Sequence, residues 1–189
     1  DANKVFPIDF DRLQRNLDGK NFYVVVSDGE TAKSEYIELS RENYINEMLA
    51  TGSLPVLMKN PITLNNKRKF DGGITDPLPV KKAYEMGARD ITLIRTYEET
   101  FIRKTKFENY IAALATKSYP NISRALISNT ETYNSALEFI KNPPSDCVIK
   151  QICPPHRLKT KRATTNHSIM KADYLVGTQA GQKFLQKSL

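Results

Sequence analysis

The sequence has no hydrophobic run that could cross a membrane. Its longest clean apolar runs are short pieces such as Tyr23-Val24-Val25-Val26, whereas a spanning helix needs about 18 or more consecutive apolar residues. We therefore expect a soluble protein. With 189 residues, 40% of them hydrophobic, the chain has the size and apolar content of one globular domain, or of one domain plus a small appendage.

The chain has little cysteine and no clear metal motif. Cys147 and Cys153 are too few for a disulfide scaffold, and they lack the CxxC spacing of a structural metal site. We expect two free thiols, as is typical of a reducing compartment such as the cytoplasm. His156 and His167 have no repeating acidic partner, so we expect no metal and no cofactor.

Other signals are missing at the start of the chain. It opens on Asp1-Ala2-Asn3-Lys4, without an initiator methionine and without a charged segment followed by an apolar one, as in a secretion signal. There is also no internal repeat of 20 to 50 residues. From this start we expect the sequence to be a piece of a longer protein.

The charge is unbalanced, with 28 basic and 21 acidic residues and a formal net charge of +7. A basic surface attracts polyanions. The excess gathers in two short runs, residues 67–69 and 157–162, and no RNA-binding aromatic signature or zinc-finger spacing accompanies them. We expect a solvated basic surface and no nucleic acid partner, with attraction to an anionic membrane surface as the alternative.

The hydrophobic pattern predicts an α/β fold, with helices packed on a mostly parallel sheet. Residues 21–27 predict a strand that is covered on both faces. Residues 67–96 read as strand, turn, helix and strand, which is typical of a crossover unit of a parallel sheet. The spacing predicts further helices over residues 107–115, 123–140 and 166–186, and a last strand over 147–153.

Several local features carry their own predictions. We expect Ser40 to cap a helix that ends near Gly52, with Tyr44, Ile45, Met48 and Leu49 packed inward. Residues 56–58 and 62 predict a short buried stretch. On the C-terminal helix, Tyr174 and Phe184 lie at helical spacing, and we expect both in the core.

Asp71 is the residue with the strongest physical claim to chemistry. It directly follows a predicted strand and enters the Gly72-Gly73 turn, where functional groups of α/β proteins gather. A carboxylate there can accept a proton from a nucleophile. Aspartate before glycine is also a common turn dipeptide, so a purely structural role stays open. Asp28, Glu30 and Asp76 could pair with Asp71, although we expect Asp76 to cap the next helix.

The segment Phe70-Asp71-Gly72-Gly73-Ile74-Thr75-Asp76-Pro77-Leu78-Pro79-Val80 resembles the aspartate motif of the patatin-like phospholipases. Residues 83–91 are similar to the helix and strand that follow in bacterial members, and residues 49–55, with Ser53, resemble the upstream segment of small residues, serine and proline. The resemblance covers about residues 20–100. It implies a three-layer hydrolase domain portion over 1–100 and a mostly helical extension with one further strand over 101–189.

The resemblance further implies hydrolysis of phospholipids or related esters by a serine and an aspartate without a histidine. Only the aspartate, Asp71, can be carried over, with Gly72 and Gly73 as its loop. For Ser53, beside Pro55, we expect a structural role, with a place in the lining of the cleft as the alternative. No serine here stands in a Gly-x-Ser-x-Gly elbow, and the glycine-rich oxyanion loop is absent. The sequence therefore predicts the C-terminal portion of such a hydrolase, inactive alone, whose serine lies in a segment outside this chain.

Two other interpretations stay open. The chain could be a pseudoenzyme whose aspartate loop survives only as a turn, or a basic module that binds anionic lipid surfaces or nucleic acid through residues 67–69 and 157–162. Steep salt dependence of binding would favour the basic module.

Overall fold

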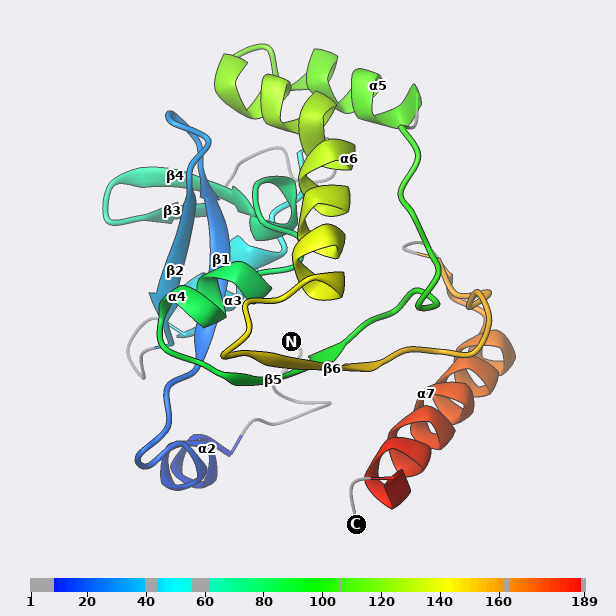
Figure 1. The fold of residues 1–189 in the computed structure, drawn as a ribbon. Helices are drawn as coiled ribbons and strands as arrows, with labels where there is room; N and C mark the ends of the chain where they lie inside the picture. Colours follow the sequence, from blue (N-terminus) through cyan, green and yellow to red (C-terminus); the bar gives the residue numbers. More distant parts are fainter. Residues whose placement is uncertain (1–8, 40–43, 56–61, 106, 162–163, 188–189) are drawn as a thin grey trace. The chain divides into compact units, whose positions relative to one another are not determined.

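The computed structural model describes residues 9–39, 44–55, 62–105, 107–161 and 164–187. Their helices and strands follow one another along the chain as shown in Figure 1: α2 (Phe10–Asn16), β1 (Tyr23–Asp28), β2 (Ser34–Glu38), α3 (Tyr44–Thr51), β3 (Ile62–Leu64), β4 (Lys67–Asp71), the 3-10 helix η1 (Gly72–Ile74), α4 (Val80–Glu85), β5 (Asp90–Ile94), α5 (Phe107–Ala115), α6 (Pro120–Lys141), β6 (Val148–Ile152) and α7 (His167–Lys187). The expected cap Ser40 and the stretch 56–58 lie outside the described residues.

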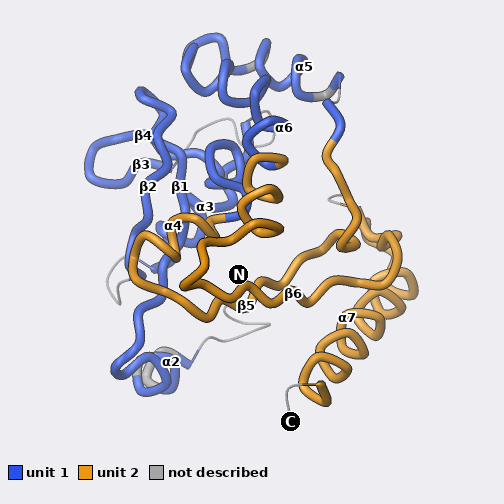
Figure 2. Tube along the Cα trace, viewed as in Figure 1, with its two compact units in different colours: residues 1–78, 104–133 blue, residues 79–103, 134–189 orange. Residues whose placement is uncertain are grey.

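The chain forms two compact units, each built from two separate stretches of sequence (Figure 2). The first unit comprises residues 1–78 and 104–133, and the second comprises residues 79–103 and 134–189. Within the described residues, no helix has the length and the apolar character that a bilayer span requires.

The first unit contains a four-stranded sheet in the order β2-β1-β4-β3, and every neighbouring pair is antiparallel. The prediction of a mostly parallel sheet was therefore wrong. β4 pairs with β1 and β3, whereas β5 pairs with β6 in a separate sheet, so residues 67–96 are not a crossover unit. The turn between β3 and β4 explains the antiparallel pairing locally: Asn65 and Asn66 have φ angles of 51° and 61°, which suit a tight two-residue hairpin turn.

Each face of this sheet has its own hydrophobic cluster. Val26, Ala50 and Leu64 pack together on the face that α3 covers. Phe70, Ile74 and Ile122 form the second cluster, where the first half of α6 meets the sheet. Ser27 pairs with Phe70 in the β1–β4 register, and successive side chains of a strand point to opposite faces, so Val26 and Phe70 lie on opposite faces.

The inward face predicted for α3 was wrong. Ile45, Met48 and Leu49 are exposed, whereas Glu47 and Ala50 are buried. The apolar residues of this short helix are spread over more than one side, and Ala50 is the side chain small enough to sit directly against Val26 and Leu64. Helical spacing alone therefore identified the helix but selected the wrong contact face.

The second unit contains α4, the parallel pair β5 and β6, and α7. The predicted last strand is confirmed as β6, whose register with β5 runs from Asp90↔Val148 to Ile94↔Ile152. The core position expected for Tyr174 was wrong, because this side chain is 72% exposed. In the described part of the chain, no residue of α7 is buried, so this helix rests on its unit with only partial contact.

Candidate functional site

Asp71 is the last residue of β4, and its main chain is held from both sides. Its N–H donates to the carbonyl oxygen of Ser53 at 2.9 Å, and its own carbonyl accepts from Ser27 Oγ at 2.8 Å. The side chain also has a fixed contact, since Asp71 Oδ1 accepts from the N–H of Gly73 at 2.7 Å. A carboxylate of intermediate exposure is thus presented from a well-anchored backbone.

The two glycines that follow Asp71 differ in what they require. A Cβ atom on Gly72 would lie 2.2 Å from the carbonyl oxygen of Val25, so the loop crosses β1 too closely for any side chain. Gly73 is exposed, and a Cβ there would lie 3.0 Å from Asp71 Oδ1. Gly72 therefore sets the path of the loop, while Gly73 allows the bond between its N–H and the carboxylate.

Three hydroxyls form a chain of hydrogen bonds beneath the loop. Ser27 Oγ lies 2.8 Å from Thr75 Oγ1, and Ser34 Oγ donates to Thr75 Oγ1 at 2.9 Å. Each hydroxyl has a single proton to donate. Since Ser27 donates to the carbonyl of Asp71, Thr75 must donate to Ser27, and the chain runs in one direction from Ser34 towards Asp71. Ser27 thereby holds the main chain of Asp71, and the other two hydroxyls orient Ser27.

Asn129 of α6 ties the other end of the loop. Its Nδ2 donates to the carbonyl oxygens of Gly73 at 2.7 Å and of Ile74 at 2.9 Å, and its side chain is buried. The sequence analysis missed this residue. A signal was present, because Asn129 interrupts the apolar face of α6 formed by Ile122, Leu126 and Tyr133, and a polar residue at such a position needs a partner.

Ser53, the other residue of the predicted site, lies next to Asp71 through the main-chain bond described above. Its side chain is buried, and its Oγ makes no hydrogen bond with the part of the chain that the structure describes. An unpaired buried hydroxyl is uncommon in folded proteins. The structure places Ser53 beside Asp71 through a main-chain hydrogen bond, and the role of Ser53 in a cleft stays a prediction.

Asp76 does not cap the next helix, contrary to the prediction. The N-cap of α4 is Pro79, which has no capping side chain, and Asp76 Oδ2 instead accepts from the hydroxyl of Tyr36 at 2.5 Å. Three residues separate Asp76 from the start of α4, which puts its carboxylate out of register with the free N–H groups of the first turn.

A buried ion pair lies on the same strand as Asp71. Lys69 Nζ is 2.9 Å from Asp28 Oδ2 and 2.7 Å from Glu35 Oε2, and the side chains of Lys69 and Asp28 are each only 2% exposed. Of the basic run 67–69, therefore, only Lys67 and Arg68 reach the surface. Arg68 in turn donates to the hydroxyl of Tyr119, which orients the guanidinium and leaves its charge in place.

The ion pair shifts the pKa values of both partners. Burial alone would raise the pKa of Asp28, but hydrogen bonds from Lys69 and Thr31 outweigh it and hold the pKa far below the usual range for aspartate. Burial alone would lower the pKa of Lys69, but its bonds to Glu35 and Asp28 outweigh that and raise the pKa. Both groups are therefore charged at neutral pH, and Asp28 acts as a structural anion.

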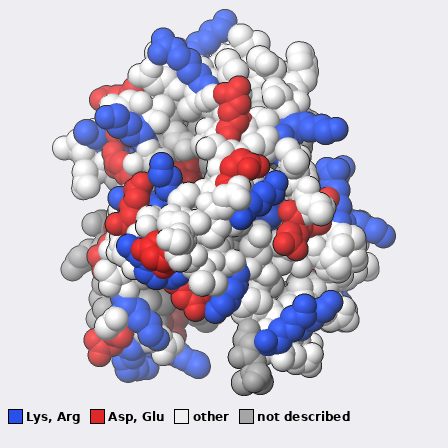
Figure 3. Space-filling model, viewed as in Figure 1, with Lys and Arg blue, Asp and Glu red and all other residues white. Residues whose placement is uncertain are grey.

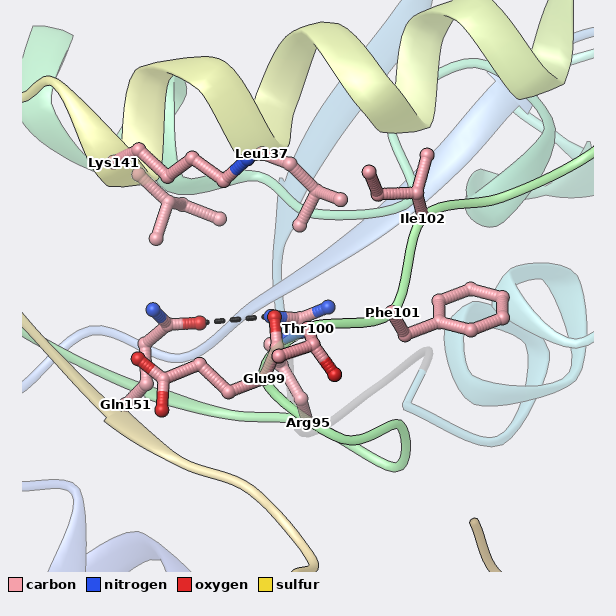
Figure 4. A pocket seen from close by; sticks show the side chains of 9 residues that line it. Arg95, Glu99, Thr100, Phe101, Ile102, Leu137, Lys141 and Gln151 are labelled. Carbon is pink, nitrogen blue, oxygen red and sulfur yellow. Dashed lines mark hydrogen bonds between the residues drawn. The ribbon is translucent and has the colours of Figure 1, made fainter. Parts of the chain in front are cut away.

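The second unit contains a separate cavity of about 350 Å³. Figure 4 shows Arg95 and Gln151 joined by a hydrogen bond on one side, with Leu137 on the other. The Arg95 Nη1 atom donates to Gln151 Oε1 at 2.9 Å. The Arg95 guanidinium, which also donates to the carbonyl oxygen of Glu99 at 3.3 Å, and the aliphatic carbon of Leu137 line the cavity. Sequence reasoning missed it because its walls come from four separate segments, although Arg95 directly after an apolar strand was a signal.

Within the described residues, no group of three or more His, Cys, Asp or Glu side chains could hold a metal ion. Cys147 and Cys153 are both free thiols. Figure 3 shows Lys and Arg side chains interspersed with Asp and Glu on the visible face, so no single basic field covers it.

Sequence comparisons match the chain to a family model and to a curated protein. A family model described as "Domain of unknown function (DUF6363)" matches residues 119–189, which hold α6, β6 and α7. "Uncharacterized protein YjjU" of Escherichia coli (strain K12) is 25% identical over 181 residues, which cover 95% of this chain and 51% of that protein. The chain thus spans about half the length of this curated relative, and neither printed name states an activity.

Proposed function

We propose that this chain carries the proton-accepting aspartate of a lipid acyl hydrolase, with Asp71 acting on a serine that a segment outside this chain supplies. The substrate class is a phospholipid or a related carboxylic ester. The support from sequence is the resemblance of residues 70–80 to the aspartate motif of patatin-like phospholipases. The proposal concerns the chemistry of this loop and does not require a parallel sheet.

The geometry of Asp71 is the observation that carries the proposal. Its N–H, its carbonyl and one carboxylate oxygen are each bonded to a different partner, namely Ser53, Ser27 and Gly73. A general base is effective when its position is set before the reaction begins. The loop that follows Asp71 is held further by a glycine without room for a Cβ and by the clamp from Asn129.

A single proton acceptor, Asp71, serves both halves of the proposed reaction. The serine oxygen attacks the ester carbonyl carbon while Asp71 takes the hydroxyl proton, and the protonated Asp71 then gives that proton to the leaving alcohol. In the second half of the reaction, Asp71 takes a proton from water, whose oxygen attacks the carbonyl carbon of the acyl-serine. The bond between that carbon and the serine oxygen breaks, Asp71 returns the proton to the serine oxygen, and the fatty acid is released. The donors that stabilise the tetrahedral oxyanion would come from the same outside segment as the serine. The double length of the curated relative leaves room for a segment of this kind.

The setting of this activity is also a proposal. Two cysteines without a disulfide suit a reducing compartment, and a phospholipid substrate lies in a bilayer. We therefore propose that the complete protein, meaning this chain together with its serine-bearing segment, works in the cytoplasm at a membrane surface.

Labelling with a serine-reactive fluorophosphonate tests the proposal. The complete protein should be labelled at one serine outside this chain, and Asp71→Asn should slow the labelling by about 100-fold or more, the low end of general-base contributions. Asp90→Asn is the matched control, because Asp90 forms a surface ion pair with Lys150, and such pairs contribute little. A complete protein that is not labelled is a pseudoenzyme, and the proposal then fails.

The rival interpretation as a basic binding module has one supporting observation, the exposed side chains of Arg157, Lys159 and Lys161. It predicts that binding to anionic lipid or nucleic acid falls steeply with ionic strength, and that neutralising these three residues abolishes the function. Hydrolysis of a neutral soluble ester should change little with salt under the hydrolase proposal.

A further inference from the structure

Helix α5 presents a continuous apolar stripe to solvent. Phe107, Tyr110, Ile111 and Leu114 recur at the spacing that places them on one side of a helix, and all four are exposed, Phe107 by 77% and Leu114 by 63%. Exposed large apolar residues are normal when scattered singly, but a contiguous group of this kind marks an interaction surface.

The stripe faces outward because another side of α5 is committed to packing. Ala113 is buried, and Ser123 Oγ of α6 donates to its carbonyl oxygen at 2.9 Å. Just beyond the helix, Thr116 Oγ1 lies 2.9 Å from the same serine oxygen. Small residues thus let α5 lie close to the first turn of α6, and these contacts hold the helix so that its large side chains point away from them.

Basic residues precede and follow α5 in the sequence. Over residues 104–124 the sequence has four basic residues, Lys104, Lys106, Lys117 and Arg124, against the single acid Glu108. Among them, Lys104, Lys117 and Arg124 are exposed. An apolar helix face with aromatic residues and a basic surround has the composition of a helix that lies in the headgroup region of an anionic bilayer.

We propose that α5 is the membrane-docking element of this protein, with Phe107 and Leu114 inserted among the lipids of an anionic bilayer and the flanking lysines on its headgroups. The proposal rests on the proposed function, because a lipid hydrolase must reach a substrate held in a bilayer. Charge favours lipid over a protein partner as the occupant, since apolar protein interfaces are depleted in lysine around their centre, whereas anionic headgroups attract each nearby lysine.

Co-sedimentation with vesicles tests the docking. The complete protein should bind vesicles of about three parts phosphatidylcholine to one part phosphatidylglycerol, and Phe107→Ser/Leu114→Ser should weaken this binding at least tenfold. Tyr174→Ser/Leu185→Ser on α7 is the matched control, because these side chains are equally exposed, at 72% and 64%, and it should change binding less than twofold. Lys104→Glu/Lys117→Glu should also lose binding, and none of the proteins should bind phosphatidylcholine alone.

Equal binding by the α5 variant and the wild type would overturn the proposal. The proposal would also be overturned if another part of the complete protein, or a second copy, covers this apolar face. The α5 variant would then lose its fold, measured by circular dichroism, or its self-association, measured by analytical ultracentrifugation, and would keep its lipid binding. Failure of the hydrolase proposal is distinguishable. Asp71→Asn should lower hydrolysis of a soluble ester about 100-fold or more and leave vesicle binding intact, whereas the α5 variant should lose vesicle binding and keep the hydrolysis.

Discussion

Replacing Lys69 by methionine should destabilise the first unit strongly. The change keeps the length of the side chain but removes the ammonium that lies 2.9 Å from Asp28 Oδ2. Asp28 Oδ1 keeps its three donors, the N–H groups of Glu30 and Thr31 and the hydroxyl of Thr31. Breaking a buried pair costs about 3–5 kcal/mol, and because half of the carboxylate stays satisfied we expect about 3 kcal/mol.

This loss is large compared with the total stability of about 5–15 kcal/mol for a folded domain. For a chain of this size it corresponds to a fall in Tm of about 6–12 °C, measurable by circular dichroism. Hydrogen exchange should locate the loss in the amides of β1 and β4. Asp28→Asn/Lys69→Met is the control, since asparagine keeps an oxygen for the turn donors and removes the unpaired charge, and it should recover most of the stability.

The pH dependence gives the sharper test of the same reasoning. Because the folded pKa of Asp28 lies below its unfolded value of about 3.9, its contribution is fully present above that value and is lost as the pH falls. In Lys69→Met, the carboxyl group of Asp28 is buried without the lysine, which raises its pKa relative to the wild type. Asp28 is therefore protonated in the folded variant at a higher pH than in the wild type. The stability difference between wild type and variant should therefore shrink below about pH 4. A difference that stays constant down to about pH 2, or one below about 1 kcal/mol at neutral pH, would refute the reasoning.

Two further predictions concern the loop that holds Asp71. Gly72→Ala should lower the stability by about 1–3 kcal/mol through overpacking and should lower ester hydrolysis by the complete protein, because the new Cβ meets the main chain of Val25. Gly181→Ala is the control: a Cβ there has nothing within 4 Å, so it should stabilise α7 by up to about 1 kcal/mol. Chemical denaturation measures both changes in stability. Asn129→Asp keeps the shape of the side chain, but its carboxylate has no N–H donors. It should lower the stability by about 1–3 kcal/mol, because the carbonyl oxygens of Gly73 and Ile74 lose their hydrogen bonds. Amide exchange across residues 72–76 should become faster, and unchanged exchange would contradict the prediction.

The elements of this protein could be predicted from sequence better than their arrangement. α5 has the predicted bounds, and α6, α7 and β6 lie within a few residues of the expected ranges, because hydrophobic periodicity is a local property. Sheet pairing is not local. A strand, a turn, a helix and a second strand over residues 67–96 suggested one parallel sheet, yet the two strands belong to different sheets, and nothing within that segment distinguishes the two outcomes.

Much the same applies to the site. Asp71 and Gly72 could be named because they stand in one contiguous motif, and Ser53 because it stands in a second segment, residues 49–55, whereas the partners that hold the loop come from β1 and α6. The burial of Lys69 shows the limit most clearly. Its neighbours Lys67 and Arg68 are exposed, and only the register of β4 against β1, which places Lys69 opposite Asp28, explains why a lysine in a basic run is buried.

The most direct test of the account is the hydrolysis of a soluble short-chain ester by the complete protein and by its Asp71→Asn variant. Asparagine keeps an oxygen for the N–H of Gly73 but cannot accept the serine proton, so we predict that kcat falls about 100-fold or more, with the fold unchanged and with Asp90→Asn as active as the wild type. If Asp71→Asn hydrolyses the ester at the wild-type rate, Asp71 is a structural turn residue and the proposed function is wrong.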